Sequence, residues 1–413
     1  MLPKWPYSLR FRKSEFIINK MDYLLIKNGL VVSGGKIDKK NILVHDGIIV
    51  DSDFEGKASD NCEIIDAEAC YVSAGFIDMH VHGGGGYDIM DNSIQAFTEI
   101  SRIHLVHGTT TMLPTAVSAS FGDILKLIEV YCQAQKYCPN FYGLHLEGPF
   151  ISKKQKGAHK EYLLHAPSVR EVDTLIAVGG HVIKRITAAP ELDNMDYFSN
   201  KMRENGILLS IGHSDATSSV AKTAFKKGFS LITHFYNATT SIRKIDQEIV
   251  AGINEATLLD PNVAIEIIAD GKHTAVESVQ LAVKIKGTDS VAFVTDALRP
   301  TGLNVSKSYL GEEKPENLII IEDGVAKLPD RSSFAGSIAT SNKLLENGIK
   351  HYGFSIEDTV KMLTETPARI LGLEKKGLIK TGYIADIVIF DKELQIKDVV
   401  LNGKIIERGN NYA

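Results

Sequence analysis

The 413-residue sequence is poor in cysteine, has no long apolar run and carries no excess of basic residues. Its four cysteines include no C-x-x-C pair, so neither a disulfide scaffold nor a zinc-ribbon or thioredoxin-type site is indicated. No apolar run reaches the roughly 18 to 20 residues of a membrane span. Lysine and arginine number 46 against 51 acidic residues, and the net charge of −5 argues against non-specific nucleic-acid binding. The disulfide-rich, membrane-spanning and nucleic-acid-binding classes are therefore excluded.

The remaining composition is that of a globular protein with a large core, because 44% of residues are hydrophobic and 23% are charged. The first 20 residues are basic but have neither a continuous apolar segment nor a small-residue cleavage site, unlike a signal peptide. We therefore expect residues 1–20 to be an N-terminal extension and the protein to be cytoplasmic.

Two β-rich stretches, residues 21–71 and 376–413, flank a long middle segment. Each consists of β-branched runs separated by glycine, asparagine and aspartate turns, and Asn402-Gly403 favours a hairpin. One interpretation is that the two stretches are unrelated and each caps one end of the middle segment. The similar composition of both ends favours instead a single small β-sandwich domain built from both termini.

Residues 72–375 alternate predicted strands with amphipathic helical stretches. Eight strands in about 300 residues predict an α/β fold of the (β/α)8 TIM barrel type. A doubly wound open sheet is the structural alternative, but no G-x-G-x-x-G fingerprint supports it. The predicted strands are AGFIDMHV, TTTMLPTAV, FYGLHLEG, HVIKRITAAPE, ILLSIGHS, FSLITHFYNA, VAIEIIADG and SVAFVTDA.

Side chains that can bind metal end five of these strands. In a barrel the active site forms at the C-terminal ends of the strands, so these side chains are expected at one mouth. His80 and His82 are two residues apart and point to the same face of a strand, where they can bind one cation. The glycine loop 83–86 that follows is expected to permit close approach of a ligand. The other strand-end residues are His145 with Glu147, His213, His234 and Asp296.

Glu147, His213 and His234 form a His, His, carboxylate set, which is common in catalytic metal sites. A metal bound there would lower the pKa of water towards about 7. Asp296 would take a proton from that water and return it to a leaving amine. Two structural alternatives remain open: a salt bridge of Glu147 that closes the barrel, and Asp296 as a helix N-cap.

The other histidines divide into two groups. His159 and His273 each follow a strand end and a glycine, so both are candidates for substrate contact. The remainder lie in predicted helices, loops or the flanking sheet and are expected to be structural or solvated. They are His45, His104, His107, His165, His181 and His351.

The motifs GFIDMHVHGGGG, HLEGPF with KGAH, IGHSDAT, THFYNA, IADGKH and VTDA resemble those of the amidohydrolase superfamily. Within it, the chain is similar to N-acetylglucosamine-6-phosphate deacetylases from about Met21 onward. The resemblance implies metal-dependent hydrolysis of the N-acetyl group to give the free amino sugar phosphate and acetate. It also implies one or two divalent metal ions per subunit (Zn, Fe, Mn or Co) and a homodimer.

The same resemblance implies a role for each matching residue. Glu147, His213 and His234 would hold the main metal, and His80 and His82 would contribute to a second one. Asp296 would act as general base and acid beside a metal-bound hydroxide. The implied substrate-binding residues are His159, Asn237, Ala238, His273 and the backbone of Phe334, Ala335 and Gly336.

The phosphate end of the site departs from the family pattern. Many members carry an R-E-P-G stretch after the N-A pair, and its arginine reaches the phosphate bound by a neighbouring subunit. Here the segment reads ATTSIRKIDQEIVAGI, and an ungapped alignment places Ile245 at the arginine position. Arg243 is nearby and is the candidate replacement.

Three hypotheses follow. The first is a deacetylase for N-acetylglucosamine 6-phosphate. The second keeps the chemistry but changes the substrate to N-acetylgalactosamine 6-phosphate, another N-acetyl sugar phosphate or an unphosphorylated amide. The third is a non-catalytic barrel that binds a sugar phosphate, and the retention of all six candidate ligands argues against it.

Overall fold

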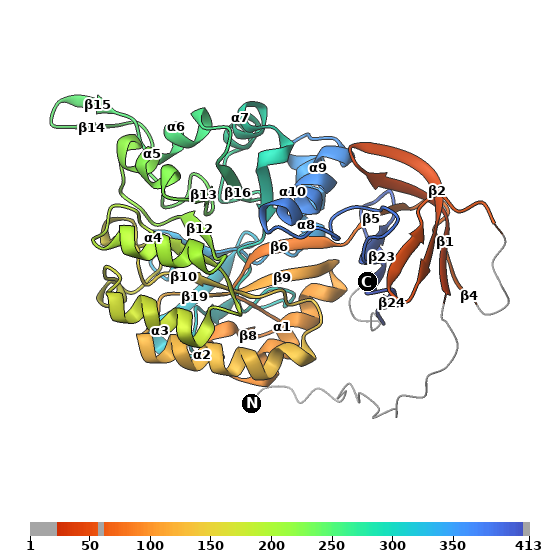
Figure 1. The fold of residues 1–413 in the computed structure, drawn as a ribbon, viewed down its shortest axis with the longest axis horizontal. Helices are drawn as coiled ribbons and strands as arrows, with labels where there is room; N and C mark the ends of the chain where they lie inside the picture. The colour runs from red at the N-terminus through yellow and green to blue at the C-terminus, as the bar shows by residue number, and fades with distance from the viewer. Residues whose placement is uncertain (1–22, 57–61, 408–413) are drawn as a thin grey trace.

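The computed structural model describes residues 23–56 and 62–407, and the expected extension over residues 1–20 lies outside them. Eight parallel strands form a barrel surrounded by helices (Figure 1). They lie in chain order around the ring, and a hydrogen bond of 3.0 Å from Asp296 N to His80 O joins the last strand to the first. The strands are β6 (Phe76–Val81), β9 (Thr109–Ala116), β10 (Leu144–Glu147), β11 (Ile183–Ala188), β12 (Leu208–Ile211), β13 (Phe229–Ile232), β16 (Ala264–Ile268) and β17 (Val291–Val294).

Each of these strands falls within a segment predicted from the sequence, so the (β/α)8 barrel is confirmed. The strand order contains no reversal, which excludes the doubly wound sheet. Nearly all of the strand residues are buried, because helices cover the outside and side chains fill the inside.

The helices begin and end where local signals place them. Ser93 accepts a hydrogen bond from Ala96 N at the start of α1, and Ser168 forms a capping box with Glu171 in α3. The helices are α1 (Ile94–Val106), α2 (Phe121–Ala134), α3 (Val169–Gly179), α4 (Met195–Glu204), α5 (Ser218–Lys226), α6 (Ile253–Leu259), α7 (Val276–Lys286), α8 (Ser341–Glu346), α9 (Ile356–Leu363) and α10 (Glu365–Ile370). Within the described residues, no helix is long and apolar enough to cross a bilayer.

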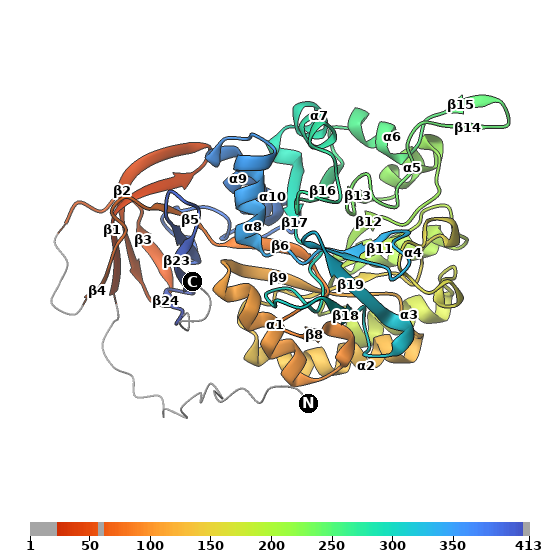
Figure 2. The same ribbon diagram turned by 180° about the vertical axis from the view of Figure 1, so that it is seen from behind.

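Strands from both ends of the chain pair in a second, mainly antiparallel sheet beside the barrel (Figures 1 and 2). Strand β5 (Tyr71–Ala74) joins the two halves by pairing with β22 (Ile387–Phe390). The sheet has its own buried core, and the Asn402-Gly403 turn closes its last hairpin with positive φ angles of 50° and 76°. The other strands are β1 (Tyr23–Ser33), β2 (Lys36–His45), β3 (Ile48–Asp51), β4 (Cys62–Asp66), β23 (Ile396–Leu401) and β24 (Lys404–Ile405).

Three smaller β elements in the described residues were not predicted, and the shortest is the pair of β7 (Gly83–Gly84) and β8 (Tyr87–Asp88). A four-stranded antiparallel sheet, here called the flap, lies between β17 and α8 in the chain and sits over the barrel mouth (Figure 2). It consists of β18 (Lys307–Tyr309), β19 (Leu318–Glu322), β20 (Val325–Lys327) and β21 (Phe334–Gly336). A hairpin of β14 (Arg243–Ile245) and β15 (Glu248–Val250) projects from the barrel after β13 (Figure 1).

Candidate active site

Four histidine side chains meet at the barrel mouth with their Nε2 atoms turned toward one another. His80 Nε2 lies 3.1 Å from His82 Nε2, and the same distance separates His213 Nε2 from His234 Nε2. Glu147 at the end of β10 lies between the two pairs. Its Oε1 is 3.2 and 2.9 Å from the Nε2 atoms of His213 and His234. Its Oε2 is 3.4 and 3.3 Å from those of His80 and His82.

Hydrogen bonds at the second ring nitrogen fix the orientation of these rings. In three of them Nδ1 donates to a backbone carbonyl, which can only accept, so a neutral ring keeps its proton on Nδ1 and leaves Nε2 for a metal ion. The carbonyls are those of Thr115 for His82, Gln155 for His213 and Asn237 for His234, at 3.0, 2.8 and 3.0 Å.

A carboxylate plays the same part for the fourth ring. His80 Nδ1 lies 2.8 Å from Glu266 Oε1, and Glu266 Oε2 is 2.5 Å from the Arg185 guanidinium. All three side chains have no exposed surface. Burial by itself would raise the pKa of Glu266, but Arg185 and His80 outweigh it and lower the pKa to about 2. The carboxylate is therefore ionised and accepts the Nδ1 proton of His80.

The residues present fit one or two divalent cations. Two groups, Glu147 with His213 and His234, and Asp296 with His80 and His82, each bring three ligand atoms within 4.8 Å of one another. Two Nε2 atoms 3.1 Å apart need positive charge between them, which either a proton or a metal ion can supply. Nitrogen and carboxylate donors of this kind suit Zn, Fe, Mn and Co alike.

Asp296 follows the last barrel strand, and its Oδ1 lies 3.0 Å from His82 Nε2. Burial favours its neutral form, but the charge of His80 and the contact with His82 outweigh that effect and lower the pKa of Asp296 to about 2. The next helix in the described chain is α8, so Asp296 is not a helix N-cap. Glu147 likewise pairs with histidines rather than with a lysine or arginine across the barrel.

The backbone is strained where several of these side chains originate. His213, His234 and Asp296 have φ angles of +48°, +29° and +51°, in a region that L residues with a Cβ rarely adopt. Such outliers persist where the surrounding fold fixes the conformation, and they cluster at functional sites.

His159 faces the Glu147 cluster from the loop after β10. Its Nδ1 accepts hydrogen bonds from Ser118, at 2.8 Å from Oγ and 3.3 Å from the backbone N. Burial, together with the nearby His213, lowers the pKa of His159 to about 3, so the ring is neutral. Nε2 therefore carries the proton, 3.7 Å from Glu147 Oε2, and can donate to a bound ligand.

His273 lies on the opposite side of the mouth, and its pKa is shifted in the opposite direction from that of His159. Its Nδ1 donates to Asp270 Oδ2 at 2.7 Å, while Asp270 Oδ1 accepts from two backbone N–H groups. Burial would lower the pKa of His273, but the hydrogen bond and charge of Asp270 outweigh it and raise the pKa. The Phe334 ring of the flap lies 5.0 Å from this imidazole.

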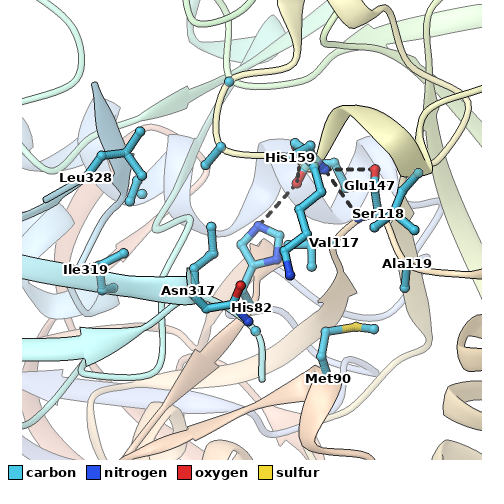
Figure 3. A pocket seen from close by; sticks show the side chains of 18 of the residues that line it. His82, Met90, Val117, Ser118, Ala119, Glu147, His159, Asn317, Ile319 and Leu328 are labelled. Atoms are coloured by element: carbon cyan, nitrogen blue, oxygen red, sulfur yellow. Dashed lines mark hydrogen bonds and ion pairs between the residues drawn. The ribbon is translucent and has the colours of Figure 1, made fainter. Parts of the chain in front are cut away.

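A cavity of about 690 Å³ joins these groups (Figure 3). The predicted site residues line it, except His80, which is fully buried, and Arg243. Flap residues from Leu310 to Gly336 form one wall, and the loop from Gly157 to Leu163 forms another. Sequence reasoning found Phe334 to Gly336 by resemblance but did not find the rest of the flap.

Arg243 lies on the projecting hairpin and is bound within its own chain. Its guanidinium pairs with the carboxylate of Asp215 and also donates to Asp215 O at 2.7 Å. Lys154 lies 3.2 Å from the same carboxylate. Arg243, the candidate phosphate contact, is thus bound to Asp215 and does not line the cavity.

Two expectations about neighbouring residues differ from the structure. The glycine loop 83–86 does not line the described cavity, because it packs on protein: a Cβ on Gly83 would lie 2.7 Å from Arg299 N. His145 ends a strand but belongs to neither ligand group. It is buried between the Thr115 and Thr187 hydroxyls, at 3.2 and 2.7 Å, and burial lowers its pKa.

Four residues that hold the candidate site residues in place were not found from the sequence: Arg185, Glu266, Ser118 and Asp270. For Arg185 and Glu266 a signal existed, since each is a charged residue within an apolar barrel strand and such residues are seldom buried without a partner. Ser118 and Asp270 carried no comparable signal, because serine and aspartate are common in loops.

Comparison with known proteins agrees with this geometry. Residues 71–406 match the model of the Amidohydrolase family. The chain is 31% identical to an N-acetylglucosamine-6-phosphate deacetylase of Lysinibacillus sphaericus over 94% of its length and 99% of that protein. It is 27% identical to an N-acetylgalactosamine-6-phosphate deacetylase of Escherichia coli O157:H7, over 93% and 99%. Among solved structures, N-acetylglucosamine-6-phosphate deacetylase from Pasteurella multocida superposes with a TM-score of 0.86 at 27% identity, over 94% and 100%.

Proposed function

Because the chain belongs to the amidohydrolase family, we propose that it hydrolyses the N-acetyl group of N-acetylglucosamine 6-phosphate to give glucosamine 6-phosphate and acetate. The observation that carries this proposal is the convergence of the two ligand groups on one cavity, with His159 and His273 on opposite sides of its mouth. Neutral His159 suits an amide, and His273 with its raised pKa suits an anion. Curated relatives with this activity span almost the whole chain.

Glu147, His213 and His234 would hold one divalent metal ion, and His80 and His82, with Asp296 beside them, a second. Such an ion activates water and polarises an amide carbonyl. Asp296 would accept a proton from the attacking water and deliver it to the departing amine nitrogen. Its Oδ1 lies 3.0 Å from His82 Nε2, beside the ligand group where the water would be activated.

The remaining residues would orient the sugar. His159 Nε2–H would donate to the substrate amide or an adjacent hydroxyl, where a fixed donor stabilises charge that develops in the reaction. His273, together with Asn237 and the backbone of Ala238, would bind the phosphate. These local donors would suffice even though the net charge of the whole protein is negative. The backbone of Phe334, Ala335 and Gly336 would contact the sugar from the flap.

The projecting hairpin is the expected contact in a homodimer. Ile242, which precedes β14, and Ile249 within β15 are 62% and 74% exposed, which is unusual for isoleucine in a monomer. Sedimentation of the purified protein measures this directly: a dimer is expected, and Ile249→Asp should shift it toward monomer.

The second candidate substrate is N-acetylgalactosamine 6-phosphate, because the chain is similar to a deacetylase of that sugar and Arg243 is engaged with Asp215. Acetate release should be measured on both phosphorylated epimers and on unphosphorylated N-acetylglucosamine. Highest kcat/KM on the glucosamine compound supports the proposal, and preference for the epimer or the unphosphorylated sugar overturns the substrate assignment. A protein that binds these sugars without releasing acetate would be the non-catalytic alternative.

A further inference from the structure

Five apolar side chains line the cavity beyond the residues assigned above, in two groups with polar residues such as Ser118 and Asn317 among them. Met90 after β6, Val117 and Ala119 after β9, and Leu310 and Ile319 of the flap line it together. Met90, Ala119 and Ile319 are 7%, 9% and 1% exposed, and the other two are half-buried. In Figure 3, Met90, Val117 and Ala119 lie on one side of His82, and Ile319 lies on the other.

Val117 and Ala119 lie across the barrel from the proposed sugar-phosphate contacts. Asn237 and Ala238 follow β13, the sixth strand of the ring, whereas Val117 and Ala119 follow β9, the second. Strands four positions apart in an eight-stranded ring stand on opposite sides. The two ligand groups and Asp296 lie between them.

An amide placed with its carbonyl at the ligand groups and its sugar toward Asn237 must direct its acyl group the other way. An acetyl group ends in one methyl, which cannot reach five apolar side chains spread over two loops and the flap. The cavity, at about 690 Å³, is also in the upper part of the range of about 300 to 1,000 Å³ found for small-molecule sites. A longer apolar group that extends in this direction would contact side chains that acetyl does not reach.

We infer that Met90, Val117, Ala119, Leu310 and Ile319 form an acyl subsite that takes unbranched N-acyl groups longer than acetyl, such as butyryl. This inference rests on the proposed function and names a broader substrate class for the same site: N-acyl amino sugar 6-phosphates. Each methylene buried in the subsite raises kcat/KM about 4-fold when its full burial free energy stabilises the transition state. Butyryl has two more methylenes than acetyl, so its kcat/KM gains up to about 15-fold.

The test compares N-acetyl and N-butyryl glucosamine 6-phosphate on the intact protein, with free amine measured as product. Wild-type protein is expected to hydrolyse the butyryl compound with a kcat/KM at least equal to that for acetyl. Val117→Phe fills the subsite and should lower the butyryl-to-acetyl ratio about 10-fold. Val178→Phe is the matched control, because Val178 is 41% exposed on α3 and does not line the cavity.

Leu310→Phe is the second variant and fills the subsite from the flap side, so the test stands if Val117→Phe does not fold. Acetyl hydrolysis with a butyryl kcat/KM more than 10-fold lower overturns the inference and leaves the proposed function intact. An unchanged ratio in both filled variants also overturns it. Failure to hydrolyse either compound contradicts the proposed function and the inference together.

Discussion

The guanidinium of Arg185 and the carboxylate of Glu266 form an ion pair, 2.5 Å apart, that has no exposed surface beneath the barrel mouth. Glu266 uses its other oxygen to hold Nδ1 of His80 at 2.8 Å. The pair therefore links the interior of the barrel to the orientation of one candidate ligand. Within the part of the chain that the structure describes, His80 is the only other charged partner within ion-pair distance of either group.

Glu266→Gln should destabilise the protein by about 3 to 5 kcal/mol, because it leaves the Arg185 charge buried without its partner. The loss should appear as a lower midpoint of urea unfolding and as reduced metal content, since the His80 ring loses its anionic acceptor. Glu204→Gln is the matched control: its pair with Lys201 is exposed and contributes less than about 1 kcal/mol. Equal stability of the two variants would show that the buried pair is not structurally important.

His159→Asn should lower kcat for N-acetylglucosamine 6-phosphate about 100- to 1,000-fold, as expected for the loss of a fixed hydrogen-bond donor. Metal content should be unchanged, because His159 belongs to neither ligand group. Ser118→Ala should have a smaller effect, since the backbone N of residue 118 still donates to His159. His165→Asn, at an exposed histidine, serves as the control and should retain full kcat. A normal kcat in His159→Asn would remove His159 from the mechanism.

Binding of the phosphorylated substrate should weaken at alkaline pH, because His273 binds an anion only while it is protonated. Its folded-state pKa is raised by Asp270, so the imidazolium persists above the ordinary value of 6.5, and KM should rise as the pH passes through the raised pKa. Asp270→Asn keeps the acceptor for the backbone N–H groups but removes the charge. The rise in KM should then shift to lower pH, while KM for the unphosphorylated sugar stays flat. A KM profile that is identical in both proteins would contradict this role.

Arg299 anchors the flap to the loop that follows the first barrel strand. Its guanidinium makes two hydrogen bonds to Asp91, at 2.5 and 2.9 Å, and another of 2.5 Å to Gly311 O in the flap. Arg299→Met should therefore release this end of the flap. We expect kcat/KM to fall about 10- to 100-fold, mainly through KM, as misplaced contacts commonly cause.

Arg331→Met is the control for this prediction, because Arg331 pairs with Glu322 on the exposed side of the flap. Limited trypsin digestion provides a readout that does not depend on activity: cleavage after Lys307 in β18 should accelerate in Arg299→Met only. If the flap resists trypsin equally in both variants, Arg299 does not anchor it.

The barrel and the ligand groups were predictable from the sequence, since both depend on local patterns. Apolar strand runs end in polar residues, and the C-terminal ends of parallel strands converge, so the positions of Glu147, His213 and Asp296 in the chain suffice to assign them to one mouth. The flap was missed because strands of three to five residues carry too little periodicity to recognise.

The other interactions at the site could not be predicted, because they join residues that are far apart in the sequence. Arg185 and Glu266 are 81 positions apart in the sequence, and Arg243 and Asp215 are 28 positions apart. Nothing local to Arg243 indicates that a carboxylate of its own chain engages it. The protonation states of His159 and His273 likewise depend on Ser118 and Asp270, whose side chains reach them only in the folded protein.

The most direct test of the proposed chemistry is acetate release from N-acetylglucosamine 6-phosphate by three preparations: protein as purified with its metal content measured, protein stripped by a chelator, and Asp296→Asn. We expect turnover that disappears with the metal, returns when a divalent ion is restored, and falls by several orders of magnitude in Asp296→Asn even when that variant is metal-loaded. Undiminished turnover in stripped protein, or in metal-loaded Asp296→Asn, would contradict metal-dependent hydrolysis with Asp296 as the proton carrier.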